Sequence, residues 1–243
     1  MSSHPPPSSW HDQETRPANL LLAAVPEEEY EGFRELLEAY PLRMRETLQE
    51  AEDPSDWVYF PTSGVISVLT VLDNGMMIEF ATIGREGTTG VPAFLRTGLS
   101  NLAYISQLPG SSLRMRTKDF LAEVDRSPRF AAIIKLYSGT MLALVAQSAA
   151  CNRAHHVDER CARWLLMTHD QTGDAAFPIP QEFLAQMLGE SRPHVELAVA
   201  ALHEAGLIGY QKGVVTITDR LGLERAACEC YAVVREQFRH LRD

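Results

Sequence analysis

The stretch from Gln181 to Ile208, QEFLAQMLGESRPHVELAVAALHEAGLI, constrains the fold of this chain most, because it holds two amphipathic runs with a short connection between them. Gly189 suits the end of the first run, since glycine accepts positive φ at a helix C-terminus. Ser191 is a good N-cap for the second run, and Pro193 suits its first turn, where a missing N–H costs little. Two short helices joined in this way predict a helix-turn-helix.

Polar residues gather at the N-terminal end of the second run, outside its apolar face. A recognition helix presents this end to base edges in the major groove of DNA. Arg192 can pair with guanine, His194 can donate or accept, and Glu196 can accept from cytosine, whereas Ser191 and the first amides suit phosphate. The predicted DNA-contacting residues are Gln181, Ser191, Arg192, Pro193, His194, Glu196, Leu197, Gln211 and Lys212.

A two-stranded ribbon, or wing, is predicted directly after the hairpin. Apolar residues lie on both sides of a turn at Gln211-Lys212-Gly213, which is typical of a short hairpin. The side chains of Gln211 and Lys212 are further candidates for phosphate contacts. The alternative is a helical hairpin that only packs against protein, but two helices followed by a wing favour DNA binding.

The charge of the chain argues against a strongly basic DNA-binding surface. The formal net charge is -10, and residues 151–243 carry 10 Lys and Arg against 13 Asp and Glu. The C-terminal part is therefore less acidic than the rest, but it is not basic. We expect weak non-specific affinity for DNA that depends steeply on salt through a few local contacts, which a dimer would double.

The N-terminal half has the pattern of a β domain. From about Leu42 to Met115 the chain is rich in Val, Ile, Thr and aromatic residues, and Asp73-Asn74-Gly75 is a strong hairpin signal between two apolar runs. Several short antiparallel strands suggest a small β-roll or barrel. Short helices are expected at Pro26–Tyr40 and Thr117–Val124, and residues 1–19, rich in Pro and Ser, are expected to be a flexible tail.

A long helix is predicted from about Pro128 to Asn152. Its apolar residues alternate at spacings of four and three, which is typical of a seam between two helices. We predict that this seam pairs with a second copy of the chain, while Ile133, Leu136 and Ala143 face the β domain; the alternative is that the seam itself packs on the β domain. The seam residues are Phe130, Ile134, Tyr137, Met141, Leu144, Ser148 and Cys151.

The cysteines show no recognisable metal-binding pattern. Around the expected hinge at residues 153–160, the spacing of Cys151, His155, His156 and Cys161 fits no standard zinc site. Cys228 and Cys230 are predicted on a helix over Leu221–Leu241, where their side chains would point about 200° apart. We therefore predict no metal site and core packing for the thiols. Haem ligation by a single His or Cys and redox sensing by an exposed thiol stay open.

In this order, a β-roll, a long seam helix and a winged helix-turn-helix resemble the Crp/Fnr family of bacterial transcription regulators. The segments WVYFPTSGVISVL, GREGTTGVPAFL, AQSAACNRAHHVDERCARWLLMTHD and AACECY, with the hairpin quoted above, carry the resemblance over roughly residues 20–240. It implies an α+β chain with a cyclic-nucleotide-binding-like sensory β-roll at 20–127, a dimerisation helix and hinge at 128–154, and a winged helix-turn-helix DNA-binding domain at 155–243. It also implies a cytoplasmic homodimer on a near-palindromic site in double-stranded DNA, with RNA polymerase as a further partner.

The residues expected to contact bases differ from those of one branch of this family. Arg192 falls where the family commonly has a guanine-reading Arg, but Pro193 and Leu197 stand where the cyclic-AMP receptor branch has an acid and a second Arg. Leucine can contact a thymine methyl but cannot pair with guanine. We therefore expect a target sequence different from that of this branch.

The effector site departs as well. Cyclic-nucleotide binders of the family have a Gly-Glu cassette for the ribose and an Arg-Ser or Arg-Ala pair for the phosphate, whereas here Glu86-Gly87 is reversed and SNLA at 100–103 lacks Arg. A buried phosphate without its guanidinium is poorly stabilised, so we expect no cyclic-nucleotide binding of the usual kind. We expect no iron–sulfur cluster, since the first cysteine is Cys151, and the effector stays unknown. The candidate pocket comprises Arg85, Glu86, Gly87, Thr88, Thr89, Asn101, Met141 and Leu144.

Two other functional classes are the alternatives to a transcription regulator. The acidic balance favours a ligand- or protein-binding module that has lost DNA binding, and such a module would not shift DNA at low salt. The sequence has no Ser–His–Asp order, Gly-rich phosphate loop or metal-ligand motif that indicates an enzyme, so we predict that the chain is not one. No run approaches the length of a membrane span, and four scattered cysteines fit a reducing cytoplasm.

Overall fold

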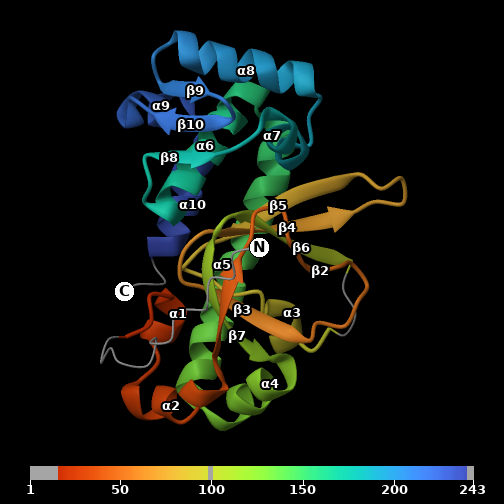
Figure 1. Cartoon of the computed structure of the whole chain (residues 1–243), viewed down its shortest axis with the longest axis vertical. Coiled ribbons are helices and arrows are strands. Elements are labelled where there is room, and N and C mark those ends of the chain that lie inside the picture. Colours follow the sequence, from red (N-terminus) through yellow and green to blue (C-terminus); the bar gives the residue numbers. More distant parts are fainter. Residues whose placement is uncertain (1–15, 98–100, 240–243) are drawn as a thin grey trace, which may run out of the picture.

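The computed structural model describes residues 16–97 and 101–239. An N-terminal β-roll and a C-terminal helical part are joined by one long helix (Figure 1), which confirms the predicted α+β class. Residues 1–15 of the expected flexible tail lie outside the described residues. Asn19 is buried and anchors the start of the described chain, because its amide donates to the carbonyl oxygens of Pro61 and Gly87.

Two antiparallel sheets form the β-roll. One has the order β1-β7-β3, with β1 at Glu38–Leu42, β7 at Gly110–Arg116 and β3 at Trp57–Pro61. The other has the order β2-β6-β4-β5, with β2 at Thr47–Gln49, β6 at Leu102–Leu108, β4 at Val65–Val71 and β5 at Met77–Ile83. Gly75, at a φ of 79°, closes the β4–β5 hairpin where the Asn-Gly signal predicted it.

Short helices cover the ends of the roll. They are α1 at Leu20–Ala23, α2 at Glu27–Glu31, the 3-10 helix η1 at Arg34–Leu36, α3 at Val91–Phe94 and α4 at Thr117–Arg126. The prediction of one helix over Pro26–Tyr40 is wrong at its end, because Tyr40 lies on β1 opposite Ser112. Pairing with β7 outweighs the helical spacing, and Pro41 is tolerated there because β1 is an edge strand.

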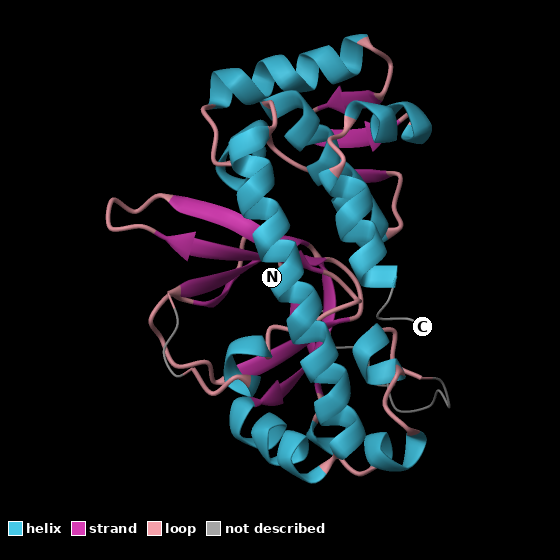
Figure 2. Cartoon of the chain, turned by 180° about the vertical axis from the view of Figure 1, so that it is seen from behind, coloured by secondary structure: helices cyan, strands magenta, loops and turns pink. Residues whose placement is uncertain are grey.

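The long helix α5 runs from Pro128 to Ala154 along the back of the strands (Figure 2). It starts as the sequence predicts, with the Ser127 hydroxyl accepting from the N–H of Phe130 at 3.3 Å. The assignment of its faces is wrong. The proposed seam residues are all buried within the one chain, and they are Phe130, Ile134, Tyr137, Met141, Leu144, Ser148 and Cys151. From Phe130 to Leu144 this face packs in the core of the roll, whereas Cys151 packs against Cys228 and Cys230, so the whole face is covered by the chain itself.

The opposite face of α5 is exposed. Leu136, expected to face the β domain, has 54% of its surface exposed, and Leu142 has 71%. Exposed residues follow one another at spacings of three and four, and we call them the outer stripe of α5: Ala132, Lys135, Gly139, Leu142, Ala146, Ala149 and Arg153. The helix therefore has two periodic faces, and the one with the large side chains is the core face.

One helix among the described residues, α5, is long and apolar enough to cross a membrane by length and composition. The expectation that no run has this length is therefore wrong. Much of its apolar character comes from the buried face that packs in the core of the roll, as in the core helix of many soluble proteins.

The C-terminal part has the predicted hairpin and wing, which confirms the winged helix-turn-helix. Its elements are α6 at Val157–Thr172, β8 at Ala176–Pro178, α7 at Gln181–Leu188, α8 at Arg192–Glu204, β9 at Ile208–Gln211, β10 at Val214–Ile217, α9 at Arg220–Ala226 and α10 at Cys230–Arg239. Strand β8 adds a third strand to the wing in the order β8-β10-β9. The expected single helix over Leu221–Leu241 is broken at residues 227–229.

The C-terminal part packs directly on the roll. Val65, Leu69 and Leu108 of the roll share one hydrophobic core with Trp164 of α6 and Leu184 of α7. A buried polar contact lies beside this core, where the indole N–H of Trp164 donates to Glu79 Oε1 at 2.7 Å. The described chain therefore holds its helix-turn-helix against its β-roll.

Candidate nucleic-acid interface

The turn between α7 and α8 has the geometry that the sequence predicts. Gly189 takes the left-handed conformation, with φ 62° and ψ 34°, and its N–H bonds to the last turn of α7. Ser191 occupies the N-cap position of α8 with extended backbone, but its side chain makes no capping hydrogen bond within the described chain. Ser191 is exposed, so its hydroxyl is accessible to a phosphate.

Helix α8 has one buried and one exposed face. Val195, Ala198, Val199 and Leu202 are buried in the core that α6 and α7 share, as expected. The other face lies across the end of the molecule farthest from the roll (Figure 1). Leu197 has 70% of its surface exposed in the middle of this face, so a large apolar side chain is available for a thymine methyl.

Arg192 is bound by two carboxylates in the DNA-free chain. Its Nη1 lies 2.9 Å from Glu182 Oε1 on α7, and its Nε lies 2.7 Å from Glu196 Oε1 one turn along α8. The hydrogen bond to Glu196 and the charges of both acids raise the pKa of Arg192 above its ordinary value. Because Arg192 is exposed, water screens both pairs, so the guanidinium can exchange them for a base at low cost.

A buried arginine that the sequence analysis missed supports the turn. Arg160 of α6 donates to the carbonyl oxygen of Leu188 at the end of α7, and its Nη1 lies 2.8 Å from Glu190 Oε1. Glu190 Oε2 in turn lies 3.5 Å from Nδ1 of His194. The only signal in the sequence is that Arg160 stands directly before the largely apolar run at residues 161–167. The contacts fix the angle between the two helices of the hairpin.

The wing turn presents its two predicted residues to solvent. Gln211 and Lys212 are exposed, and Lys212 and Gly213 have φ values of 51° and 77°, which is the pairing of a type I′ turn. The hydroxyl of Tyr210 donates to the carbonyl oxygen of Ile179 at 3.2 Å. This contact holds the wing against the chain that leads into α7, where Gln181 is partly buried.

The predicted effector pocket is not assembled as expected. Arg85 and Glu86 line a cavity of about 580 Å³, but the rest of its lining comes from the C-terminal part, namely Met167, Asp170, Gln171, Tyr231, Val234, Arg235, Glu236, Phe238 and Arg239. Glu86 is largely buried there, and its Oε1 accepts from Gln171 Nε2 at 3.0 Å.

The other predicted pocket residues have structural roles. The Thr88 hydroxyl donates to the carbonyl oxygen of Tyr59 at 2.9 Å. The Thr89 hydroxyl oxygen accepts from the backbone N–H of Tyr59, also at 2.9 Å. Gly87 packs so closely on Tyr137 that a side chain would not fit. Met141 and Leu144 are buried in the core, and Asn101 is exposed before β6. None of these six residues lines the 580 Å³ cavity, and their place in an effector pocket stays a prediction.

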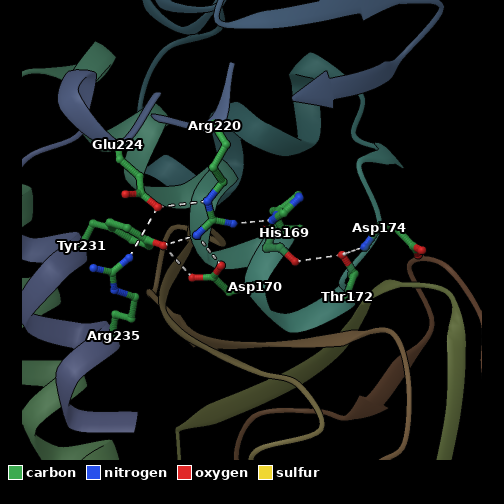
Figure 3. A network of polar contacts seen from close by, with 9 residues as sticks. His169, Asp170, Thr172, Asp174, Arg220, Glu224, Tyr231 and Arg235 are labelled. Atoms are coloured by element: carbon green, nitrogen blue, oxygen red, sulfur yellow. Dashed lines mark hydrogen bonds and ion pairs between the residues drawn. The ribbon is translucent and has the colours of Figure 1, made fainter. Parts of the chain in front are cut away.

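A polar network borders the cavity on the C-terminal side (Figure 3). Arg220 at the start of α9 lies 2.6 Å from Asp170 and 3.0 Å from Glu224, and it also contacts His169 and Tyr231. The Tyr231 hydroxyl donates to Asp170 at 2.8 Å, and burial raises its pKa to about 12. The network ties α6, α9 and α10 into one unit, and residues so far apart in sequence gave no signal of it.

Candidate metal ligands also come together, against prediction. Cys151, His155, Cys228 and Cys230 each offer one ligand atom, and these atoms all lie within 4.8 Å of one another. The prediction that Cys228 and Cys230 point apart assumed a helix, but Cys228 lies between α9 and α10. Cys161 packs separately in the core of the C-terminal part, and His156 caps α6.

The comparisons with known proteins agree with this architecture. The Crp-like helix-turn-helix domain family matches residues 159–226. FixK2 from Bradyrhizobium japonicum superposes with a TM-score of 0.68 at 15% identity, over 79% of this chain and 98% of that one. A Crp/Fnr family regulator from Eubacterium rectale gives 0.65 at 15%, over 83% and 94%. No curated protein sequence matches the chain.

A third similar structure is that of CLP, described as a c-di-GMP responsive global regulator of Xanthomonas campestris, with a TM-score of 0.61 at 16% identity over 79% of this chain and 99% of that one. The matched domain family and these shared folds confirm the resemblance read from the sequence. The chain thus carries a Crp-like helix-turn-helix domain on the fold of the Crp/Fnr family of transcription regulators.

Proposed function

We propose that the chain regulates transcription as a homodimer that reads a specific sequence in double-stranded DNA with the N-terminal end of α8. The observation that carries the proposal is the exposed end of α8 on a Crp-like domain, where Arg192, His194 and Leu197 stand clear of the core. Such a helix end, at the tip of the molecule, can enter a major groove without a clash from the roll.

The outer stripe of α5 supports the dimer. Its exposed residues keep the spacing of a two-helix seam, and most are small, with Leu142 as the one large apolar side chain of the stripe. Small residues let two helices approach closely, and a leucine in the centre supplies apolar burial. We propose that this stripe, in place of the buried face, pairs with a second copy in the cytoplasm.

Selection of DNA from a random duplex library by the full chain tests the proposal. We expect enriched sequences with two inverted half-sites whose centres lie about 34–36 Å apart, since paired recognition helices meet successive major grooves on one side of the duplex. Failure to enrich any sequence at low salt would instead favour a ligand- or protein-binding module that has lost DNA binding.

A further inference from the structure

Three cysteines and a histidine converge where the end of α5 meets the start of α10. Cys151 lies in the last turn of α5, and His155 follows that helix directly. Cys228 lies just before α10, and Cys230 is its first residue. The three thiols are buried and form a cluster apart from the two large hydrophobic cores.

The spacing of the four groups fits a single metal ion. Cys151 Sγ lies 3.5 Å from Cys228 Sγ, and Cys230 Sγ lies 3.6 Å from His155 Nδ1. In a tetrahedral zinc site, bonds of about 2.0–2.3 Å place neighbouring ligand atoms about 3.3–3.8 Å apart. A disulfide would need sulfur atoms about 2.05 Å apart, and a multi-iron cluster would spread its cysteines wider than the observed 4.8 Å limit.

The surroundings of the cluster orient its ligands. His155 Nε2, the ring nitrogen on the other side from the cysteines, lies 3.1 Å from Glu229 Oε2. A carboxylate that accepts from one ring nitrogen leaves the lone pair on the other for a metal. Gln147 Nε2 also donates to Cys230 Sγ at 2.9 Å, which stabilises a thiolate. These are the supporting contacts that metal-bound His and Cys require.

We propose that Cys151, His155, Cys228 and Cys230 bind one zinc ion in a closed, four-ligand structural site. Three thiolates and an imidazole are a soft donor set that selects zinc over magnesium or calcium. The ligands flank α6 to α9, so the ion joins both ends of the helix-turn-helix domain to the end of α5. It thereby fixes the hinge at residues 155–156, where α5 passes into α6.

Metal analysis of the full chain, purified without chelators and with any affinity tag removed, tests the site. We expect about one zinc per chain in the wild type and in the control Cys161→Ala, which removes a buried cysteine outside the cluster. Cys228→Ser and His155→Ala are expected to lose at least nine-tenths of the zinc. Full zinc in Cys228→Ser, iron in place of zinc, or a wild-type mass showing a Cys151–Cys228 disulfide would each overturn the proposal.

A second measurement covers variants that fail to fold. Metal-free wild-type chain is titrated with cobalt(II), which is expected to give the visible bands of a tetrahedral ion and thiolate charge transfer in the near ultraviolet. Glu229→Gln changes only an exposed side chain, and competition with a chelator is expected to show zinc binding about 10-fold weaker or more. Unchanged zinc affinity in Glu229→Gln would overturn His155 as the fourth ligand, and an octahedral cobalt spectrum would overturn the site.

Discussion

Arg192 and Glu182 face each other across the helical hairpin, with Nη1 on α8 2.9 Å from Oε1 on α7. The guanidinium proposed to read a base is therefore paired with carboxylates of its own chain before DNA binds. Binding must exchange this carboxylate for a nucleic-acid acceptor, while the displaced acid then lies near phosphates. An acidic chain can in this way keep its non-specific affinity for DNA low and still recognise one sequence.

Glu182→Gln is expected to strengthen DNA binding. Removing the carboxylate frees Arg192 and removes a charge that repels phosphate, and because an exposed pair is weak the expected gain in affinity is on the order of 5-fold for a dimer. Fluorescence anisotropy with labelled duplex at two salt concentrations measures the change. Glu28→Gln removes the same charge from exposed α2 in the roll, and an equal gain in this control would show that net charge alone is responsible.

Leu142→Asp is expected to produce a monomer. The leucine is 71% exposed in the outer stripe of α5, and a charge there would have to be buried between two copies without a partner. Sedimentation velocity should give the mass of one 27.1 kDa chain for this variant and of two for the wild type. Leu221→Asp changes a leucine of similar exposure on α9 and should stay dimeric. A dimeric Leu142→Asp chain would contradict the proposed seam.

The buried Glu79 is expected to make folding pH-dependent. Burial raises the pKa of Glu79 from 4.5 to about 7, so between these values the folded chain binds more protons than the unfolded one, and stability falls as pH rises. At pH 8 the cost is on the order of 3 kcal/mol. Glu79→Gln keeps an acceptor for Trp164 and should be more stable than wild type at pH 8, with the difference shrinking toward pH 5. Urea unfolding measures the free energy of unfolding of both proteins. A difference between Glu79→Gln and wild type that stays constant from pH 5 to pH 8 would contradict the raised pKa of Glu79.

Arg160→Met is expected to destabilise the helix-turn-helix. It leaves the buried carbonyl of Leu188 without its charged donor, while Glu190, whose side chain is 28% exposed, is still partly hydrated, so the loss is expected to be about 1–3 kcal/mol. Chemical denaturation measures the loss. Arg225→Met, at an exposed arginine of the same part of the chain, should change stability by less than about 1 kcal/mol. Equal losses of stability in Arg160→Met and Arg225→Met would show that Arg160 does not stabilise the turn between α7 and α8.

Local signals in the sequence were enough to predict the helical hairpin and the β4–β5 hairpin. Gly189 at the end of α7 and Asn74-Gly75 between β4 and β5 take the conformations that their residue types favour. The spacing on α5 predicted the periodic face but not its neighbour, because a heptad pattern fits the chain's own core as well as a partner. The face with the large side chains packs in the chain's own core because its burial removes more apolar surface from water.

Contacts between distant segments were beyond the sequence. His155 and Cys230 are 75 residues apart, and they meet only because α10 packs beside the end of α5. A break in the helix at residues 227–229 then turns Cys228 toward the same point. Likewise, Trp164 reaches Glu79 only because the C-terminal part packs on the roll. The spacing of residues along one helix or strand does not predict such tertiary contacts.

The most direct test of DNA reading by α8 compares the wild type and Arg192→Ala on the selected site and on the same site with its conserved guanines replaced. Arg43→Ala, an exposed arginine of the roll, is the control, and unchanged thermal unfolding shows that the variants are folded. We expect Arg192→Ala to lose about 1–3 kcal/mol per half-site on the selected DNA, and to bind the substituted DNA as the wild type does. Wild-type affinity and unaltered base preference in Arg192→Ala would contradict recognition through this helix.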